Sequence, residues 1–349
     1  MKVLVTGHDG YVGSVLTPML AERGHDVHGL DSLLYTGCDF GCPPKAIATR
    51  IKDIRDVEKK DLVGFDAVIH LAAISNDPLG DLNPACTESI NLHGTIHMAK
   101  MARDARVSRF IHASTCSVYG SSGEALLDES APFNPVTPYG WAKERAEQAL
   151  AELATADFSP TYLRSGTAYG SSPRLRGDLV INNLLGWAVT TGMVRLKSDG
   201  SPWRPVVHVS DIALAFATTL EASRKVVHNQ AYNVGRRDDN FRIRELANLI
   251  QQVVPDSQIS FAEGAGPDIR NYRVNCAKIA EQIPAFKPQW DLEAGIRTLF
   301  TDFKRFSLKN KLFEENPFFR NRHVMALQSQ GRLDEMMRWV QTEEKQASC

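Results

Sequence analysis

A tyrosine and a lysine four residues apart, Tyr139 and Lys143 in Tyr-Gly-Trp-Ala-Lys, are well suited to proton transfer. They fall on a predicted helix over 138–156, and residues i and i+4 share one helix face. A free tyrosine ionises near pH ~10, and lowering its pKa by ~3 units takes about 4 kcal/mol, which a fixed ammonium one turn away can largely supply. The pair is predicted to act as a general base and its activator toward a hydroxyl.

The expected partner of this pair is a run of hydroxyl side chains, Ser114-Thr115-Cys116-Ser117, after a predicted strand over 109–114. Ligands of parallel sheets bind at the carboxyl ends of strands, where a hydroxyl can donate to or accept from a reacting oxygen. Ordinary turns also carry hydroxyls, and many surface helices carry a Tyr-to-Lys spacing of four. The combination of the two features favours a catalytic group.

Three glycines follow the first predicted strand, 2–6, in Gly7-His-Asp-Gly10-Tyr-Val-Gly13. Gly7 permits a tight turn, Gly10 leaves room for a pyrophosphate, and Gly13 lets the next helix pack closely on the strand. The helix N-terminus offers free N–H groups and a partial positive charge to phosphates. The order of strand, turn and helix indicates a dinucleotide site rather than a glycine-rich turn.

Asp31 lies 18 residues after Gly13, at the end of a second predicted strand over 26–30. Its carboxylate is placed to accept hydrogen bonds from the ribose hydroxyls of an adenosine, and it would repel a 2′-phosphate. No arginine follows it closely. The predicted cofactor is therefore NAD rather than NADP.

Strands and helices alternate over the first two-fifths of the chain, and the pattern loosens after about residue 165. We predict an α/β fold: a doubly wound parallel Rossmann sheet with a smaller α/β substrate-binding cap. The predicted strands are 2–6, 26–30, 46–51, 65–71 and 109–114. The predicted helices are 11–23, 57–62, 84–105, 138–156, 179–190, 210–222, 243–253 and 292–305.

These elements divide the chain into predicted domains. An NAD-binding domain covers 1–170, with 205–222 returning to it, and the cap covers 171–306. Residues 307–349 are expected to form a helical extension that packs on the body or on another subunit.

Composition narrows the function classes. The 349 residues carry a net charge of −1, so no basic field points to nucleic acid and no charge block points to a membrane surface. No apolar run reaches the ~18 residues of a membrane span, and Met1 leads almost directly into a strand without a signal peptide. The six cysteines are irregularly spaced, and Cys38 and Cys42 lack a second pair or a histidine cluster. We expect a cytoplasmic protein with reduced thiols and no metal.

Taken together, the motifs resemble those of the extended short-chain dehydrogenase/reductases, the NAD-dependent epimerase/dehydratase group. The resemblance extends from Lys2 to about Arg305. It is carried by VTGHDGYVG, Asp31, DIRD at 53–56, HLAA at 70–73, STCSVYG, PYGWAK and RPVVHVSD. It implies an enzyme that uses NAD and acts on a nucleoside-diphosphate sugar.

The resemblance also implies roles for single residues. Thr115, Tyr139 and Lys143 are implied to be catalytic, and Asn91 structural. The implied cofactor-binding residues are Gly7, Asp9, Gly10, Tyr11, Val12, Gly13, Asp31, Asp53, Ile54, Leu71, Ala72, Ala73, Tyr139 and Lys143. The implied substrate-binding residues are Ser75, Asn183, Leu184, Arg204, Asp268, Arg270 and Tyr272. The planar guanidinium of Arg204 suits a pyrophosphate clamp.

The reaction is the point where the family divides. Its dehydratases typically place Asp-Glu after the catalytic threonine, and this chain has Cys116 and Ser117, neither of them a strong acid. Cys116 is either a proton donor in an unusual reaction or, on the simpler interpretation, a buried thiol. We predict redox-neutral epimerisation at C4 through a transient keto-sugar. A 4-ketoreductase or dehydrogenase with net redox change stays an alternative, as does a catalytically silent NAD-binding sensor, against which the intact triad argues.

The resemblance further implies a homodimer that buries helices 84–105 and 138–156 of each subunit in a four-helix bundle. The alanines on these helices are expected to let them approach closely. They are Ala99, Ala102, Ala142, Ala146 and Ala149.

Overall fold

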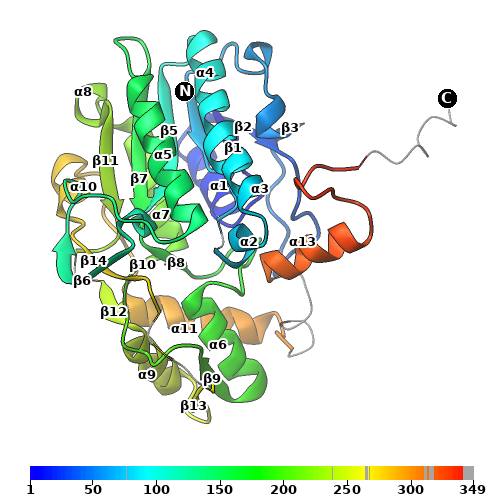
Figure 1. Cartoon of the computed structure of the whole chain (residues 1–349), viewed down its shortest axis with the longest axis vertical. Helices are drawn as coiled ribbons and strands as arrows, with labels where there is room; N and C mark the ends of the chain where they lie inside the picture. Colours follow the sequence, from blue (N-terminus) through cyan, green and yellow to red (C-terminus); the bar gives the residue numbers. More distant parts are fainter. Residues whose placement is uncertain are drawn as a thin grey trace, which may run out of the picture.

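A seven-stranded parallel sheet forms the centre of the computed structural model, which describes residues 1–75, 77–237, 239–263, 266, 268–309, 313 and 318–340 (Figure 1). The strand order is β11-β7-β5-β4-β1-β2-β3. The strands are β1 (Lys2–Thr6), β2 (Asp26–Asp31), β3 (Ala48–Ile51), β4 (Ala67–His70), β5 (Arg109–Thr115), β7 (Ser159–Ser165) and β11 (Gln230–Val234). Chain order reverses between β1 and β4, and ligands of doubly wound sheets bind in the crevice beyond such a point. The predicted Rossmann architecture is confirmed.

Helices cover both faces of this sheet, and alternate residues of β1 face opposite layers. Val3 and Val5 pack with α1 (Gly13–Glu22) and α7 (Val209–Glu221). Leu4 packs on the other face with α4 (Thr95–Asp104) and α5 (Pro138–Glu152). Burial on both faces explains why β1 is a continuous apolar run rather than an alternating one.

A smaller region with its own core lies beyond the carboxyl end of the sheet (Figure 1). Its helices α6 (Val180–Thr191), α9 (Ile243–Val253) and α11 (Leu292–Arg305) bury Leu184, Ile250 and Leu299 together. The other described strands are β6 (Ser121–Leu127), β8 (Thr167–Tyr169), β9 (Met193–Leu196), β10 (Trp203–His208), β12 (Asn240–Arg242), β13 (Gln258–Phe261) and β14 (Asn271–Val274). The remaining short helices are α2 (Asp77–Leu82), α8 (Arg224–Val227) and α10 (Ala277–Gln282).

One strand lies on the wrong side of the predicted domain boundary. β11 falls within the predicted cap, 171–306, yet it pairs in parallel with β7 as the edge strand of the main sheet. Three of its five residues are buried and two are half-buried, and sequence pattern alone cannot assign so short a run to either sheet. The other domain boundaries stay predictions.

Two predicted helices differ from the structure. Residues 57–62 form no α-helix, and only the 3-10 turns η1 (Ile54–Asp56) and η2 (Lys59–Asp61) occur there. The predicted helix 84–105 is α3 (Pro84–Glu88), a π-helical segment η3 (Ser89–Gly94) and α4. Within η3, the Asn91 amide accepts from the Ile74 N–H and donates to the Ile74 carbonyl, both at 2.8 Å. This side chain thereby fixes the loop after β4.

The alanine argument for the homodimer is wrong. Ala99, Ala102 and Ala146 are fully buried within the chain and Ala142 is 4% exposed, so these four pack the helices on their own subunit. The fifth alanine, Ala149, is half-buried. The homodimer itself stays a prediction, which sedimentation at micromolar concentration tests.

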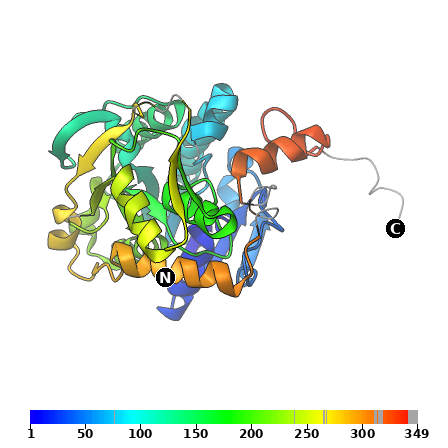
Figure 2. The same cartoon turned by 90° about the horizontal axis from the view of Figure 1, so that it is seen from below.

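The described part of the C-terminal extension packs on the body of the same chain (Figure 2). Its helix α13 (Arg320–Ser329) buries Val324 and Leu327 against Ile74 and Leu79 of the loop and helix after β4. The predicted extension 307–349 also includes 310–312, 314–317 and 341–349, which lie outside the described residues. Among the described residues, no helix has the length and apolar character needed to cross a membrane.

Candidate active site

A cavity of about 750 Å³ runs across the carboxyl ends of the strands and is closed on one side by residues of the smaller region. The loops after β1, β2, β3, β4 and β5 line it, together with side chains of α6 and β9. Every residue predicted to bind or catalyse lines this cavity except Asp9. The cavity thus brings together residues from Gly7 to Tyr272.

The glycine-rich loop forms a cradle that side chains would fill. Gly7 has a φ of +69°, and a Cβ there would lie 2.7 Å from the Ala72 amide nitrogen. A Cβ at Gly13 would lie 2.3 Å from the Gly7 carbonyl oxygen, whereas one at Gly10 would meet only that same oxygen, at 3.1 Å. Gly7 and Gly13 are therefore required by the backbone, and Gly10 keeps the cavity side of the loop bare beside the N-terminus of α1. This cradle fits the diphosphate of a dinucleotide.

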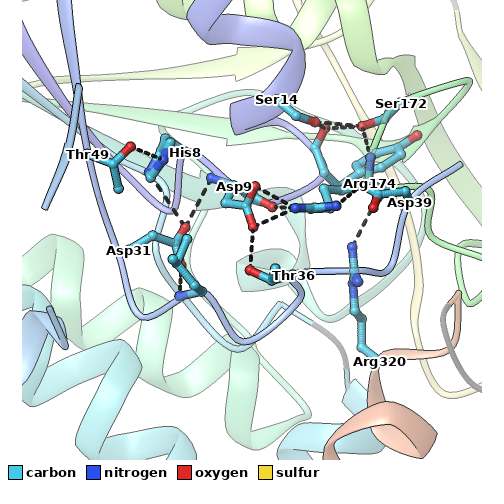
Figure 3. Close-up of polar contacts among 12 residues, drawn as sticks. His8, Asp9, Ser14, Asp31, Thr36, Asp39, Thr49, Ser172, Arg174 and Arg320 are labelled. Atoms are coloured by element: carbon cyan, nitrogen blue, oxygen red, sulfur yellow. Dashed lines mark hydrogen bonds and ion pairs between the residues drawn. The ribbon is translucent and has the colours of Figure 1, made fainter. Parts of the chain in front are cut away.

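Asp31 lies at the end of β2 on the rim of this cradle (Figure 3). Its carboxylate accepts hydrogen bonds from the N–H groups of Leu33 at 2.8 Å and Asp9 at 3.1 Å. Burial raises the pKa of Asp31 above its usual value, and these two N–H groups oppose the shift. The carboxylate is thus fixed where ribose hydroxyls of a dinucleotide would reach it.

Asp9 has an indirect place in this site. Its carboxylate is held by the Arg174 guanidinium at 2.8 and 2.9 Å, and Arg174 also donates to the Asp9 carbonyl (Figure 3). Neutralisation by Arg174 removes a negative charge that would repel a cofactor diphosphate. The Asp9 N–H instead orients Asp31.

Thr115 and Tyr139 meet in the same cavity. Thr115 ends β5, and Tyr139 occupies the first turn of α5, whose N-terminus is capped by the Thr137 hydroxyl accepting from the Gly140 N–H at 3.1 Å. Burial raises the pKa of Tyr139 above its usual value, Asp77 adds to the shift, and a hydrogen bond with the Thr115 side chain opposes it. The Thr115 hydroxyl and, to a smaller extent, the Arg176 charge therefore favour the ionised tyrosine.

Lys143 does not lower the Tyr139 pKa as the spacing predicted. Its Nζ donates to the Ala113 carbonyl at 2.7 Å and lies 6.0 Å from the centroid of the Tyr139 ring. Burial lowers the pKa of Lys143 to about 7, and Glu147 opposes the shift. Desolvation therefore dominates the pKa shifts of both Tyr139 and Lys143, and the spacing of the two residues in the sequence gives no information about their burial.

Cys116 is a core residue. Its thiol is fully buried, donates to the Arg164 carbonyl at 3.0 Å, and is absent from the cavity lining. Burial raises the pKa of Cys116 well above its usual value. The simpler interpretation, a buried thiol, agrees with this geometry. Ser117 does line the cavity, with its hydroxyl 3.4 Å from that of Tyr272.

The residues predicted to bind the substrate form a charged chain along the cavity. Arg204 pairs with Asp268 at 2.9 Å, Asp268 pairs with Arg270 at 2.7 Å, and Arg270 continues to Asp77. Burial lowers the pKa of Arg204 relative to an exposed arginine. Asn183 also lines the cavity, where its amide donates to the Gly177 carbonyl at 2.7 Å. These contacts hold donors at the end of the cavity opposite the glycine-rich loop.

Arg176 and Asp77 are two charged side chains among the lining residues that sequence reasoning missed. Arg176 donates to the Ser75 hydroxyl at 3.0 Å and to the Ser75 carbonyl at 3.1 Å, and it pairs with Asp178 at 3.0 Å. The Asp77 Oδ1 is buried and has no hydrogen-bond partner among the described residues. Arg174 and Arg176 lie two residues apart in the segment before α6, and this spacing was a usable signal for Arg176. No sequence pattern pointed to Asp77.

The C-terminal extension also reaches this cavity, which the sequence did not indicate. Phe319, Arg320, Asn321 and Met337 line it.

The fold, the glycine cradle and the Thr115–Tyr139–Lys143 group define a nicotinamide-dinucleotide-dependent enzyme with a Rossmann domain.

Comparison with known proteins gives the family. Residues 3–235 match the NAD dependent epimerase/dehydratase family, and the chain belongs to it. The chain is therefore an NAD-dependent enzyme.

Two relatives illustrate the similarity. A putative UDP-glucose 4-epimerase of Methanocaldococcus jannaschii is 30% identical over 84% of this chain and 96% of its own. A UDP-glucose 4-epimerase of Mycolicibacterium smegmatis is 28% identical over 88% of this chain and 100% of its own.

Among solved structures, the NAD-dependent NDP-hexosamine 5,6-dehydratase TunA superposes with a TM-score of 0.78. The match covers 87% of this chain and 98% of TunA at 22% identity, so it supports the fold alone.

Proposed function

We propose that this enzyme interconverts C4 epimers of a nucleoside-diphosphate sugar through a transient keto-sugar. The observation that carries the proposal is one cavity that holds Thr115, Tyr139, Lys143 and the dinucleotide cradle, while the Cys116 thiol points into the core. These residues supply one acid–base centre, which is what removal and return of a single hydride require. Relatives that are UDP-glucose 4-epimerases favour the same reaction.

The work of each residue follows from its position. Tyr139 accepts the proton of the C4 hydroxyl and later returns it, and Thr115 orients the reacting oxygen. Lys143, as an ammonium, holds the ribose beside the nicotinamide. NAD held in this cradle would supply the acceptor and donor of the hydride. The proposed site for the nucleoside diphosphate is the end of the cavity that carries Ser75, Asn183, Leu184, Arg204, Asp268, Arg270 and Tyr272.

Elimination of water is a second candidate reaction because Asp77 gives it a possible acid. Asp77 lines the cavity, acts electrostatically on Tyr139, and keeps Oδ1 unpartnered among the described residues. Its other oxygen is bound to the Arg270 guanidinium, so this carboxyl group is already engaged in an ion pair with the predicted substrate-binding residues. Epimerisation is therefore preferred.

Product analysis tests the choice. The purified enzyme is incubated without added NAD with UDP-, dTDP-, GDP- and CDP-hexoses, and products are identified by NMR and mass spectrometry. We expect one substrate to give an epimer of equal mass. NADH formed in proportion to substrate, on adding NAD, would indicate a dehydrogenase, and a product lighter by one water would indicate elimination. The Asp77→Asn variant then separates these outcomes, since it should abolish elimination.

A further inference from the structure

The C-terminal segment from Phe318 to Val340 is tied to the loops that form the adenosine side of the cavity. The Trp339 indole N–H donates to the Ser32 carbonyl at 2.6 Å, directly after Asp31. Arg338 donates to both carboxylate oxygens of Asp56, at 2.6 and 3.1 Å, just beyond Asp53. The segment therefore bridges the loops after β2 and β3. Asp31 and Asp53, two acids predicted to bind the cofactor, lie at the start of these loops.

An apolar contact fastens the same segment to the loop and helices after β4. The segment contributes four buried side chains and the body three, and they form one cluster. Its members are Val324, Leu327, Leu333, Met337, Ile74, Leu79 and Cys86. Met337 and Arg320 continue from this cluster into the cavity lining. The segment is thus a wall of the cofactor cavity rather than a distant appendage.

Arg320 is the charged member of this wall. It is 3% exposed, and its Nη2 donates to the Arg174 carbonyl at 3.0 Å (Figure 3). Its guanidinium lies 3.9 Å from the centroid of the Tyr35 ring. Its Nη1 is buried and has no hydrogen-bond partner among the described residues. A buried, unsatisfied donor on a permanent cation is unfavourable, so a ligand atom is the expected acceptor.

The nearby carboxylates are engaged elsewhere. Asp178 is bound by Arg176, and Asp9 and Asp39 are bound by Arg174. Arg176 is itself a buried cation that acts on Tyr11 of the glycine-rich loop. The three arginines here therefore balance the three carboxylates, and what distinguishes Arg320 is its unpartnered Nη1 donor, which an oxygen of an anionic diphosphate would satisfy.

We propose that the C-terminal segment completes the cofactor site: Arg320 donates from Nη1 to the diphosphate of NAD, and the anchored segment keeps the cofactor from exchanging. The segment lies outside residues 3–235, which the family model matches. The proposal depends on NAD use and not on which sugar is the substrate. It does bear on the reaction class, because a cofactor that stays bound is what a redox-neutral cycle requires.

The test compares Arg320→Gln with Arg322→Gln, which removes the same charge from an exposed position on the same helix. NAD content after purification and the NAD dissociation rate are measured by stopped-flow displacement. We expect dissociation ~10–100-fold faster in Arg320→Gln, from the loss of a charged hydrogen bond, and an unchanged rate in Arg322→Gln. Arg320→Lys, which keeps the charge without the planar fork, should fall between them.

Two further measurements complete the test, and the first keeps the proposal falsifiable even if Arg320→Gln folds poorly. Arg338→Gln and Trp339→Phe remove the anchors at Asp56 and Ser32 without touching the cavity charge, and both should release NAD several-fold faster. UDP binding to the NAD-loaded protein should not change in Arg320→Gln. Weaker UDP binding with unchanged NAD dissociation would assign Arg320 to the substrate and overturn the proposal, as would wild-type NAD dissociation in all these variants.

Discussion

The two ends of the cavity are built in different ways. At the catalytic end, Thr115, Tyr139 and Lys143 come from the end of β5 and the start of α5, within 30 residues of sequence. At the adenosine end, the glycine-rich loop and Asp31 meet Arg320 and Met337, which follow some 300 residues later. The comparison shows that motifs describe the first end, whereas long-range packing completes the second.

The two ends of the cavity also differ in their electrostatics. At the catalytic end, Glu147 pairs with Arg164 at 2.7 Å and acts on Lys143, and Asp77 keeps an acceptor oxygen, Oδ1, without a donor among the described residues. At the adenosine end, Arg320 keeps a donor without an acceptor among the described residues. Variants at the first end should therefore change chemistry, and variants at the second should change cofactor retention.

Tyr139→Phe gives the largest expected effect. Loss of the phenol oxygen removes the proton acceptor, so turnover should fall by roughly 10²–10⁴-fold. NAD dissociation should be unchanged, because the ring remains in place. Activity is followed by product NMR and NAD content by absorbance after denaturation. Retention of most activity would show that Tyr139 is not the base.

Asp31→Ala should mainly change cofactor choice. The wild-type carboxylate is expected to favour NAD over NADP because it accepts from ribose hydroxyls and repels a 2′-phosphate. Removing a charged hydrogen bond should weaken NAD binding about 10–100-fold and narrow the preference. Calorimetric titration of both cofactors into stripped protein measures this, and tighter wild-type binding of NADP would refute it.

The depressed Lys143 pKa predicts a pH-dependent stability. In the NAD-free folded protein this pKa is about 7, against 10.5 for the ordinary lysine, so between these values the unfolded state binds more protons. Stability should therefore rise with pH through this window and gain nothing from Lys143 below pH 7. From pH 7 to pH 9 the wild type should gain about 2 kcal/mol relative to Lys143→Met, measured by urea unfolding. Parallel pH profiles for the two proteins would contradict the assignment.

Thr115→Val is expected to have the smallest effect. It removes the hydroxyl that hydrogen-bonds Tyr139 but keeps the base, so turnover should fall about tenfold. The pKa of Tyr139 should rise further, so the acidic limb of the pH–rate profile should move to higher pH. A loss as large as that of Tyr139→Phe would place the primary acid–base role on Thr115 instead.

The sequence predicted the Rossmann sheet and the cavity lining around it because both depend on local signals. Buried strands, glycines beside phosphates and a helix-borne Tyr and Lys leave marks within a few residues. The placement of β11, the turn of Asp9 toward Arg174, and the reach of Arg320 into the cavity depend on partners distant in the chain. The prediction that the Tyr139 pKa is lowered was wrong for a related reason, since burial is a property of the folded cavity and not of sequence spacing.

The central claim is a redox-neutral reaction with retained NAD, and isotope transfer tests it most directly. The active nucleotide sugar, labelled with deuterium at C4, is incubated with purified enzyme in ordinary water without added cofactor. The account predicts an epimer of unchanged mass that keeps its deuterium at C4, from less than one equivalent of NAD per turnover. Loss of the label, loss of water, or accumulation of reduced cofactor with the substrate consumed would contradict it.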